Sequence, residues 1–209
     1  MESSAPDSAT ASGPGSSLRA RLREGTADLH AAVERSMDLP ASVCSLRDYA
    51  DLLRRCYDLH SGVESRWSAP GWARAWGRVG IDLAQHRRAS LLEADLLALG
   101  EAAPTAVVVA RLPTLASWGE GLGSLYVLEG SSLGGRVLGP AIRAALGPVP
   151  TTFFDGSGRE SRTAWRSVGR ALAQFEGDGG DGDEVLRGAR DTFVAFGDHV
   201  ARADLSGLR

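Results

Sequence analysis

The sequence predicts an all-α protein with a single folded domain. Apolar residues recur at helical spacing in several long segments, and no segment alternates apolar and polar residues strongly enough to predict a strand. Prolines and glycines separate these segments, as expected at the ends of helices. At 209 residues the chain is long enough for one domain with a sizeable core. We therefore expect about six to eight helices and no internal repeat.

The N-terminal residues differ in composition from the rest of the chain. Residues 1–17 consist mainly of Ser, Ala, Gly and Pro and contain few apolar anchors. Such a segment cannot bury enough apolar surface to offset the entropy of ordering. The sequence therefore predicts a disordered tail over 1–17 and a folded domain over 18–209.

Two helices are predicted at the start of the domain. The first covers residues 18–37 and ends before Pro40, because proline disfavours the α conformation in the preceding residue. One face of it carries four apolar side chains: Leu18, Leu22, Leu29 and Val33. The second covers about 46–67, with Ser45 as its N-cap and Asp48 in its first turn.

The rest of the chain predicts further helices separated by turns. Trp72 and Trp76 follow a Pro-Gly break and belong to a loop or a short helix. Phe153 and Phe154 are expected in a loop over 149–158. The remaining helices are predicted over 89–99, 113–146, 159–175 and 183–203.

Composition excludes several functions. The net charge of −3 and the pI near 5.8 argue against a nucleic-acid-binding protein, which would carry a basic surface. Cys44 and Cys56 do not make a disulfide framework, and Cys56 is expected in the core. No apolar run has membrane-spanning length, and no signal-peptide pattern opens the chain. We expect a soluble, cytoplasmic protein without a membrane partner.

A glycine-bearing stretch in the predicted helix over 113–146 is unusual. Three glycines, Gly130, Gly134 and Gly135, interrupt its apolar pattern, although each costs a helix roughly 1 kcal/mol relative to alanine. Such a helix either packs tightly against another helix or lets a large, flat group approach its backbone. The pattern alone leaves both interpretations open.

A histidine and a glutamate on the first predicted helix form a candidate ligand pair. His30 and Glu34 are four residues apart, so their side chains can meet on one face. A carboxylate on the second nitrogen of an imidazole is typical of a metal ligand. One histidine suffices for haem iron, whereas a zinc site needs three or four protein ligands. The same spacing also occurs in purely structural pairs.

The other three histidines weaken any argument from spacing alone. His60 and Glu64 repeat the same spacing on the second helix. His86 lies beside two arginines in a polar stretch and is expected to face solvent. His199, near the end of the last helix, is expected on the surface.

Taken together, the two stretches resemble the haem oxygenase family. The order Arg-Glu-Gly-Thr-Ala-Asp-Leu-His30-x-x-x-Glu34, followed much later by Tyr-Val-Leu-Glu-Gly-Ser-Ser-Leu-Gly-Gly over 126–135, is similar to that family. The likeness is greatest to the bacterial branch that makes biliverdin, including members found beside bacteriophytochromes, and it runs from about Leu18 to Val200. It implies a haem oxygenase-like fold with haem between the first helix and a kinked distal helix.

The resemblance also implies roles for individual residues. His30 would ligate the haem iron, and Glu34 would orient its imidazole. Gly130, Gly134 and Gly135 would let the distal helix approach the macrocycle and O₂. Haem would be both substrate and cofactor.

Four further residues are implicated through the same resemblance. Arg23 matches a basic residue that pairs with a haem propionate, and Arg166 is a candidate for the second propionate. Phe193 would pack near the haem edge or simply in the core. Ser131 stands where animal members carry an aspartate that orders the proton-delivering water. Bacterial relatives often lack this aspartate and can order water through backbone groups.

The resemblance implies a biochemical reaction and partners for it. Haem would be cleaved with O₂ to biliverdin, ferrous iron and CO, and electrons would come from a ferredoxin or a flavoprotein reductase. A bacteriophytochrome would be a possible recipient of biliverdin. Two alternatives remain: a non-enzymatic haem-binding, storage or delivery protein on the same scaffold, and a thiamin-degrading relative that uses an active-site cysteine.

Overall fold

Helices make up all of the regular structure in residues 16–105, 111–156 and 159–201, the part of the chain that this computed structural model describes. Residues 1–15 of the predicted tail lie outside this part. The α-helices are α1 (Leu18–Gly25), α2 (Ala27–Met37), α3 (Leu46–Arg66), α4 (Trp72–Arg78), α5 (Ala89–Ala98), α6 (Trp118–Leu146), α7 (Thr152–Asp155), α8 (Arg159–Gly177) and α9 (Gly182–Phe196). A short 3₁₀ turn, Leu83–Gln85, precedes α5, and a π-helical turn, Gly197–Ala201, follows α9.

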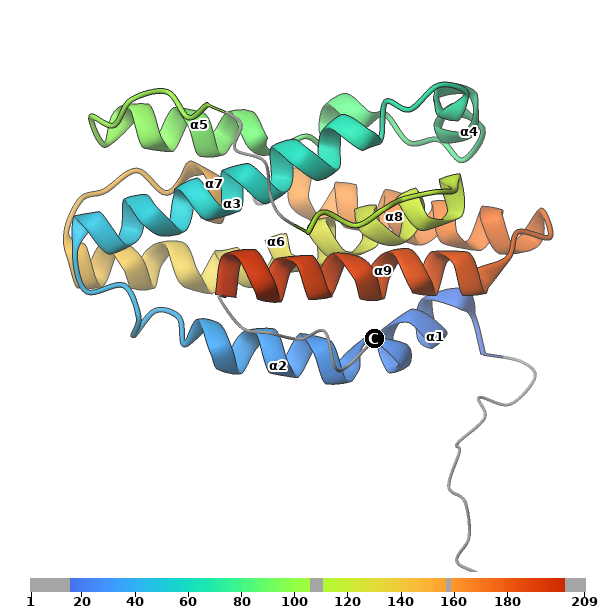
Figure 1. The fold of residues 1–209 in the computed structure, drawn as a ribbon, viewed down its shortest axis with the longest axis horizontal. Coiled ribbons are helices and arrows are strands. Elements are labelled where there is room, and N and C mark those ends of the chain that lie inside the picture. Colours follow the sequence, from blue (N-terminus) through green and yellow to red (C-terminus); the bar gives the residue numbers. More distant parts are fainter. Residues whose placement is uncertain (1–15, 106–110, 157–158, 202–209) are drawn as a thin grey trace, which may run out of the picture.

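The helices are arranged around a central pair, α6 and α9. Figure 1 shows α1 and α2 below this pair and α3 and α5 above it, and α8 packs against α6 and α1. The long helix α6 therefore has neighbours on several sides, and α2 stands at one edge of the bundle. Among the described residues, no helix combines the length and the apolar character needed to cross a membrane.

Two glycines allow the central helices to touch through their backbones. A Cβ added to Gly123 on α6 would lie 2.1 Å from the Val185 carbonyl oxygen on α9. A Cβ added to Gly188 on α9 would lie 2.1 Å from the Glu120 carbonyl oxygen on α6. Neither distance can accommodate a carbon atom, so both glycines are required by the α6–α9 contact.

Gly188→Ala is expected to destabilise the protein strongly. The added methyl group meets backbone rather than a flexible side chain, so the two central helices must move apart. Overpacking of this kind costs about 1–3 kcal/mol, and the upper end is expected here. Urea unfolding followed by circular dichroism measures the loss. Gly77→Ala on α4 is the control, because open space surrounds that glycine and alanine favours a helix. Equal stability of the two variants would contradict the role of Gly188.

The first predicted helix is in fact two helices that meet at Thr26. The Thr26 hydroxyl donates to the Leu22 carbonyl oxygen at 2.8 Å, and the backbone at Thr26 (φ −120°, ψ 2°) leaves the α conformation. Arg190 of α9 donates to the Gly25 carbonyl oxygen and to the Asp28 carboxylate, which holds the junction against the bundle. The prediction of one continuous helix was therefore wrong, because tertiary contacts bend the chain there.

Other boundaries also depart from the sequence prediction. The long helix begins at Trp118 rather than Pro113, because Ser117 caps it by accepting a hydrogen bond from the Glu120 amide. It then runs through its glycines and Pro140 to Leu146. The last regular α-helix ends at Phe196. Its predicted extension to 203 continues only as a π-helical turn to Ala201, and the positions after 201 are not described.

The predicted loop over 149–158 contains a short helix, α7. Asp95 of α5 accepts hydrogen bonds from the backbone amides of Thr152 and Phe153 at 3.0 and 2.9 Å. A buried carboxylate thus satisfies the first amides of α7. Local sequence could not reveal this helix, because its cap lies more than fifty residues away.

Candidate functional site

The His30–Glu34 pair stands on an accessible face of α2. The side chains are 55% and 70% exposed, and His30 Nδ1 lies 3.5 Å from a Glu34 carboxylate oxygen. The edge of the imidazole meets the buried Phe193 ring of α9, with 5.7 Å between ring centroids. The ring is therefore supported on one side, and no residue in the described part of the chain is hydrogen-bonded to its Nε2.

The middle of α6 presents an open face that is nearly free of side chains. Gly130, Gly134 and Val137 recur at helical spacing, and Ser131 lies beside them. The Trp165 ring covers Gly130, 3.5 Å from where its Cβ would be, so the open part of the face is at Gly134 and Val137. No atom of the described chain lies within 4 Å of where a Cβ on Gly134 would be, and the Val137 side chain is 74% exposed. This part of α6 therefore has space for a ligand close to its backbone.

Gly135 has a different environment from Gly134. A Cβ on Gly135 would lie 2.5 Å from the Phe154 carbonyl oxygen of α7. A Cβ on Gly139, one turn further, would lie 2.2 Å from a carboxylate oxygen of Asp155. Both interpretations of the glycine-bearing stretch are thus represented: Gly135 permits helix packing, whereas Gly134 borders open space.

Arginine and aromatic side chains gather where α1, α6 and α8 meet. The Trp165 ring of α8 lies 5.3 Å from the Tyr126 ring, and the Arg19 guanidinium lies 5.2 Å from the Trp165 ring centroid. Burial raises the pKa of the Tyr126 hydroxyl, and the nearby charges of Arg19 and Arg23 partly oppose that rise. Arg23 is itself exposed, so this corner offers a positive charge to an incoming anion.

Two other predicted site residues are engaged with their own helices. Arg166 is exposed on α8, and its guanidinium donates to the Arg162 carbonyl oxygen at 3.2 Å and to the Thr163 hydroxyl at 3.4 Å. The Ser131 hydroxyl donates to the Leu128 carbonyl oxygen at 2.8 Å. Either side chain would have to accept further partners, or turn, to act on a ligand.

His86 is buried, so the prediction that it faces solvent was wrong. Its Nδ1 lies 2.8 Å from a Glu129 carboxylate oxygen of α6, and its Nε2 lies 3.3 Å from the Ser167 hydroxyl of α8. The two neighbouring arginines made the local sequence polar, but partners distant in sequence bring the imidazole inside.

The second His-x-x-x-Glu pair is structural. The side chains of His60 and Glu64 are only 2% and 6% exposed, and their closest atoms are 3.2 Å apart. Glu64 also accepts hydrogen bonds from the backbone amides of Arg88 and Ala89, at the start of α5. The pair therefore caps a helix. His199, predicted on the surface, is only partly exposed and faces Asp58 at 3.5 Å.

A single thiol is expected to react in the native protein. Cys56 is buried in the core as predicted, and burial raises the pKa of its thiol to about 12. It therefore stays protonated and unreactive at neutral pH, whereas Cys44 is exposed. Titration with an aromatic disulfide reagent should release one equivalent from native protein and two after denaturation, and Cys44→Ser should lose the native signal. Reaction of Cys56 in the native protein would support the thiamin-degrading alternative, which uses an active-site cysteine.

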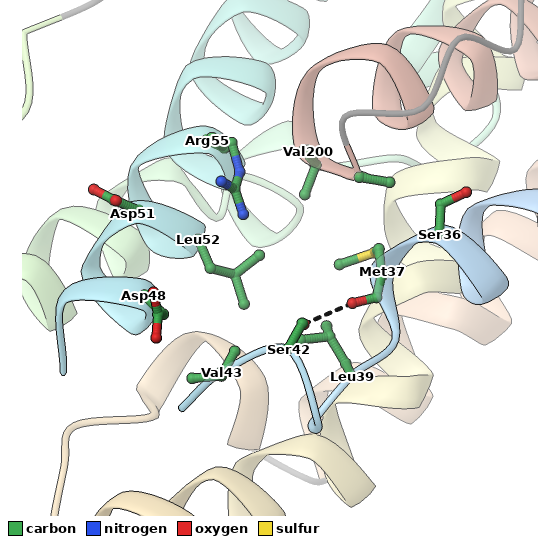
Figure 2. A pocket seen from close by; sticks show the side chains of 11 residues that line it. Ser36, Met37, Leu39, Ser42, Val43, Asp48, Asp51, Leu52, Arg55 and Val200 are labelled. Carbon is green, nitrogen blue, oxygen red and sulfur yellow. Dashed lines mark hydrogen bonds between the residues drawn. The ribbon is translucent and has the colours of Figure 1, made fainter. Parts of the chain in front are cut away.

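A small pocket lies between α2, α3 and the turn after α9. It has a volume of about 240 Å³, and Met37, Leu52, Arg55 and Val200 are among the side chains around it. Figure 2 shows the Ser42 hydroxyl donating to the Met37 carbonyl oxygen at 2.7 Å on its rim. This volume falls below the usual range for ligand sites, and none of the predicted site residues lines the pocket.

The α2 and α6 features fit one class of ligand. A supported imidazole with a carboxylate on one nitrogen can ligate iron through the other, and an apolar helix face without side chains can receive a flat ring. An arginine near one end suits the carboxylates of such a ring. These features are compatible with a haem site on an α-helical scaffold.

Comparison with known proteins makes this class specific. The chain is 31% identical, over 149 residues, to a protein named heme oxygenase from Xanthomonas campestris pv. campestris (strain 8004), which covers 71% of this chain and 86% of that protein. No family model matches the chain. The fold is similar to a crystal structure of the NO- and CO-bound heme oxygenase from Neisseria meningitidis, with a TM-score of 0.69 and 24% identity over 89% of this chain and 90% of that one. The chain belongs to the haem oxygenase family.

Proposed function

We propose that this chain is a haem oxygenase that binds haem between α2 and the open face of α6. The substrate is cleaved with O₂ and externally supplied electrons to biliverdin, ferrous iron and CO. When bound, haem supplies the iron that activates O₂ and is also the molecule that is cleaved. The family relationship supports the reaction, and the geometry of His30 supports the placement.

The accessible His30–Glu34 pair is the observation that carries this proposal. With Nδ1 directed to the Glu34 carboxylate, Nε2 is the nitrogen that ligates the iron. The carboxylate increases the basicity of the imidazole and fixes its orientation. Phe193 holds the ring from the side of α9. Burial alone distinguishes this pair from His60–Glu64, which has no open face.

The open face of α6 controls what can stand above the macrocycle. Gly134 leaves room for O₂ by presenting no side chain, and Gly130 lets the Trp165 ring lie against α6 beside that space. The proton of the Ser131 hydroxyl is committed to the Leu128 carbonyl, so its oxygen acts by accepting a hydrogen bond from water. Gly135 contributes indirectly, because it lets α6 lie against α7.

Arginines at the α1–α8 corner bind the propionates. Arg23 lies near Tyr126 and is exposed, so it can meet one carboxylate without being desolvated first. Arg166 binds the second after releasing its contacts within α8.

Electrons are delivered by a protein partner. A ferredoxin or a flavoprotein reductase is the proposed donor, as the family relationship supports. The bacterial resemblance also suggests that biliverdin passes to a bacteriophytochrome. Mixing the reaction product with an apo-bacteriophytochrome and following its red absorbance tests this transfer; an unchanged spectrum contradicts it.

An absorption series tests the proposed reaction. Purified protein is mixed with haemin and then given ascorbate, or a reductase and ferredoxin, in air. The Soret band should bleach while a broad band grows towards the red, and chelatable iron should appear. A Soret band that persists through reduction would favour a haem-binding or delivery protein. No Soret shift on mixing would overturn haem binding itself.

A further inference from the structure

A buried triad ties three separate segments together behind the open face of α6. His86 precedes α5, Glu129 belongs to α6 and Ser167 belongs to α8. The His86 and Glu129 side chains are only 2% and 1% exposed. Among the described residues, no triad side chain is hydrogen-bonded to a residue assigned above to haem or O₂, so the proposed reaction does not account for the triad.

Hydrogen bonds join the three side chains in a row, with His86 in the middle. The Ser167 hydroxyl donates to the Ala164 carbonyl oxygen at 2.7 Å, and its oxygen lies 3.3 Å from His86 Nε2. Glu129 accepts from His86 Nδ1 at 2.8 Å. His86 therefore links Glu129 of α6 to Ser167 of α8 through its two ring nitrogens. Apolar residues in place of such a buried pair would often give a core of equal stability. One documented use of buried polar groups is instead to fix the register of packed helices.

The triad is placed to fix the position of α6 relative to α8 near Gly130. Glu129 precedes Gly130, and Ser167 is two residues from Trp165. The Trp165 ring lies 3.5 Å from where a Cβ on Gly130 would be, and it also packs on Tyr126. A shift of either helix would move the Trp165 ring across Gly130 or away from it.

We propose that His86 is a positioning residue for haem cleavage. It links Glu129 of α6 to Ser167 of α8, and this lock holds the Trp165 ring in place against Gly130. The lock thereby fixes how closely α6 can approach the haem. This inference rests on the proposed function. Loss of the lock should leave haem binding through His30 intact but impair the coupling of electron use to ring cleavage, because placement of O₂ is sensitive to small displacements.

Two kinds of variant test the lock. The double variant His86→Phe/Glu129→Leu replaces the buried pair with apolar side chains, so that no charge is left unpaired. Ser167→Ala removes only the link to α8, and Ser167→Thr restores a hydroxyl that can make the same bonds. Ser61→Ala is the matched control, because Ser61 of α3 is half-buried and donates to the Asp58 carbonyl oxygen within its own helix.

The readouts are the Soret titration, urea unfolding, and biliverdin and hydrogen peroxide formed per NADPH in a reductase-coupled assay. Ser61→Ala should match the wild type. Ser167→Ala and the double variant should keep the Soret titration, yet yield at least about threefold less biliverdin per NADPH with more peroxide. Ser167→Thr should recover most of the yield. A purely structural triad would change the unfolding midpoint alone.

Unchanged coupling in Ser167→Ala and in a folded double variant overturns the inference while the proposed function stands. If the double variant does not fold, the comparison of Ser167→Ala with Ser167→Thr decides. A wild type that binds haem but forms no biliverdin overturns the proposed function and the inference together.

Discussion

His30→Ala is expected to abolish the normal Soret and low-spin features of the haem complex while leaving helix content intact. The imidazole is half-exposed and lies against the edge of Phe193, so its removal should hardly affect folding. Loss of an orienting partner typically costs roughly 10–100-fold in metal affinity, and loss of the ligand itself should cost more. Haemin titration by absorption, with circular dichroism on the same samples, measures both effects.

Added imidazole sharpens this test. Free imidazole should enter the space left by the His30 side chain and restore the low-spin spectrum. Glu34→Gln should give a smaller loss of affinity, since it weakens only the orientation of the ring. His199→Ala is the control, because His199 is the other partly accessible histidine and faces Asp58. An unchanged haem spectrum in His30→Ala would show that the proximal assignment is wrong.

Gly134→Leu is expected to bind haem and yet to lose most of its turnover. The structure leaves open space at this position, so leucine can be accommodated and should favour the helix by up to about 1 kcal/mol. The same side chain would crowd the site where O₂ must stand. Displacements of about 1 Å in an active site can reduce rates by as much as about 100-fold, and a reduction of at least tenfold is expected. Single-turnover formation of biliverdin, measured beside the urea midpoint, separates the two effects.

The control for this prediction is Gly77→Leu, at a helical glycine that also borders open space. It should leave turnover unchanged. Stability that is kept or raised together with lost turnover would identify Gly134 as functional rather than structural. Wild-type turnover in Gly134→Leu would contradict the placement of α6 over the haem at the O₂ site.

Much of the fold could be predicted from local sequence. Periodicity placed α3 and α5 to within a residue or so, because Ser45 and the glycine after α5 are local signals. The break at Thr26 and the helix α7 were missed for one reason. Arg190 and Asp95 hold these segments by hydrogen bonds from far along the chain. Periodicity within a segment contains no information about such partners.

The sequence by itself determined the helical class, the buried face of the first helical segment and the two stretches that carry the family likeness. Tertiary structure decided what those stretches can do. His30–Glu34 and His60–Glu64 have the same spacing, but one pair stands at the edge of the bundle and the other lies beneath α5. His86 was predicted on the surface but lies in the interior, because Glu129 and Ser167 supply its hydrogen bonds. Spacing along a helix fixes which side chains can meet, whereas solvent exposure depends on which other helices cover them.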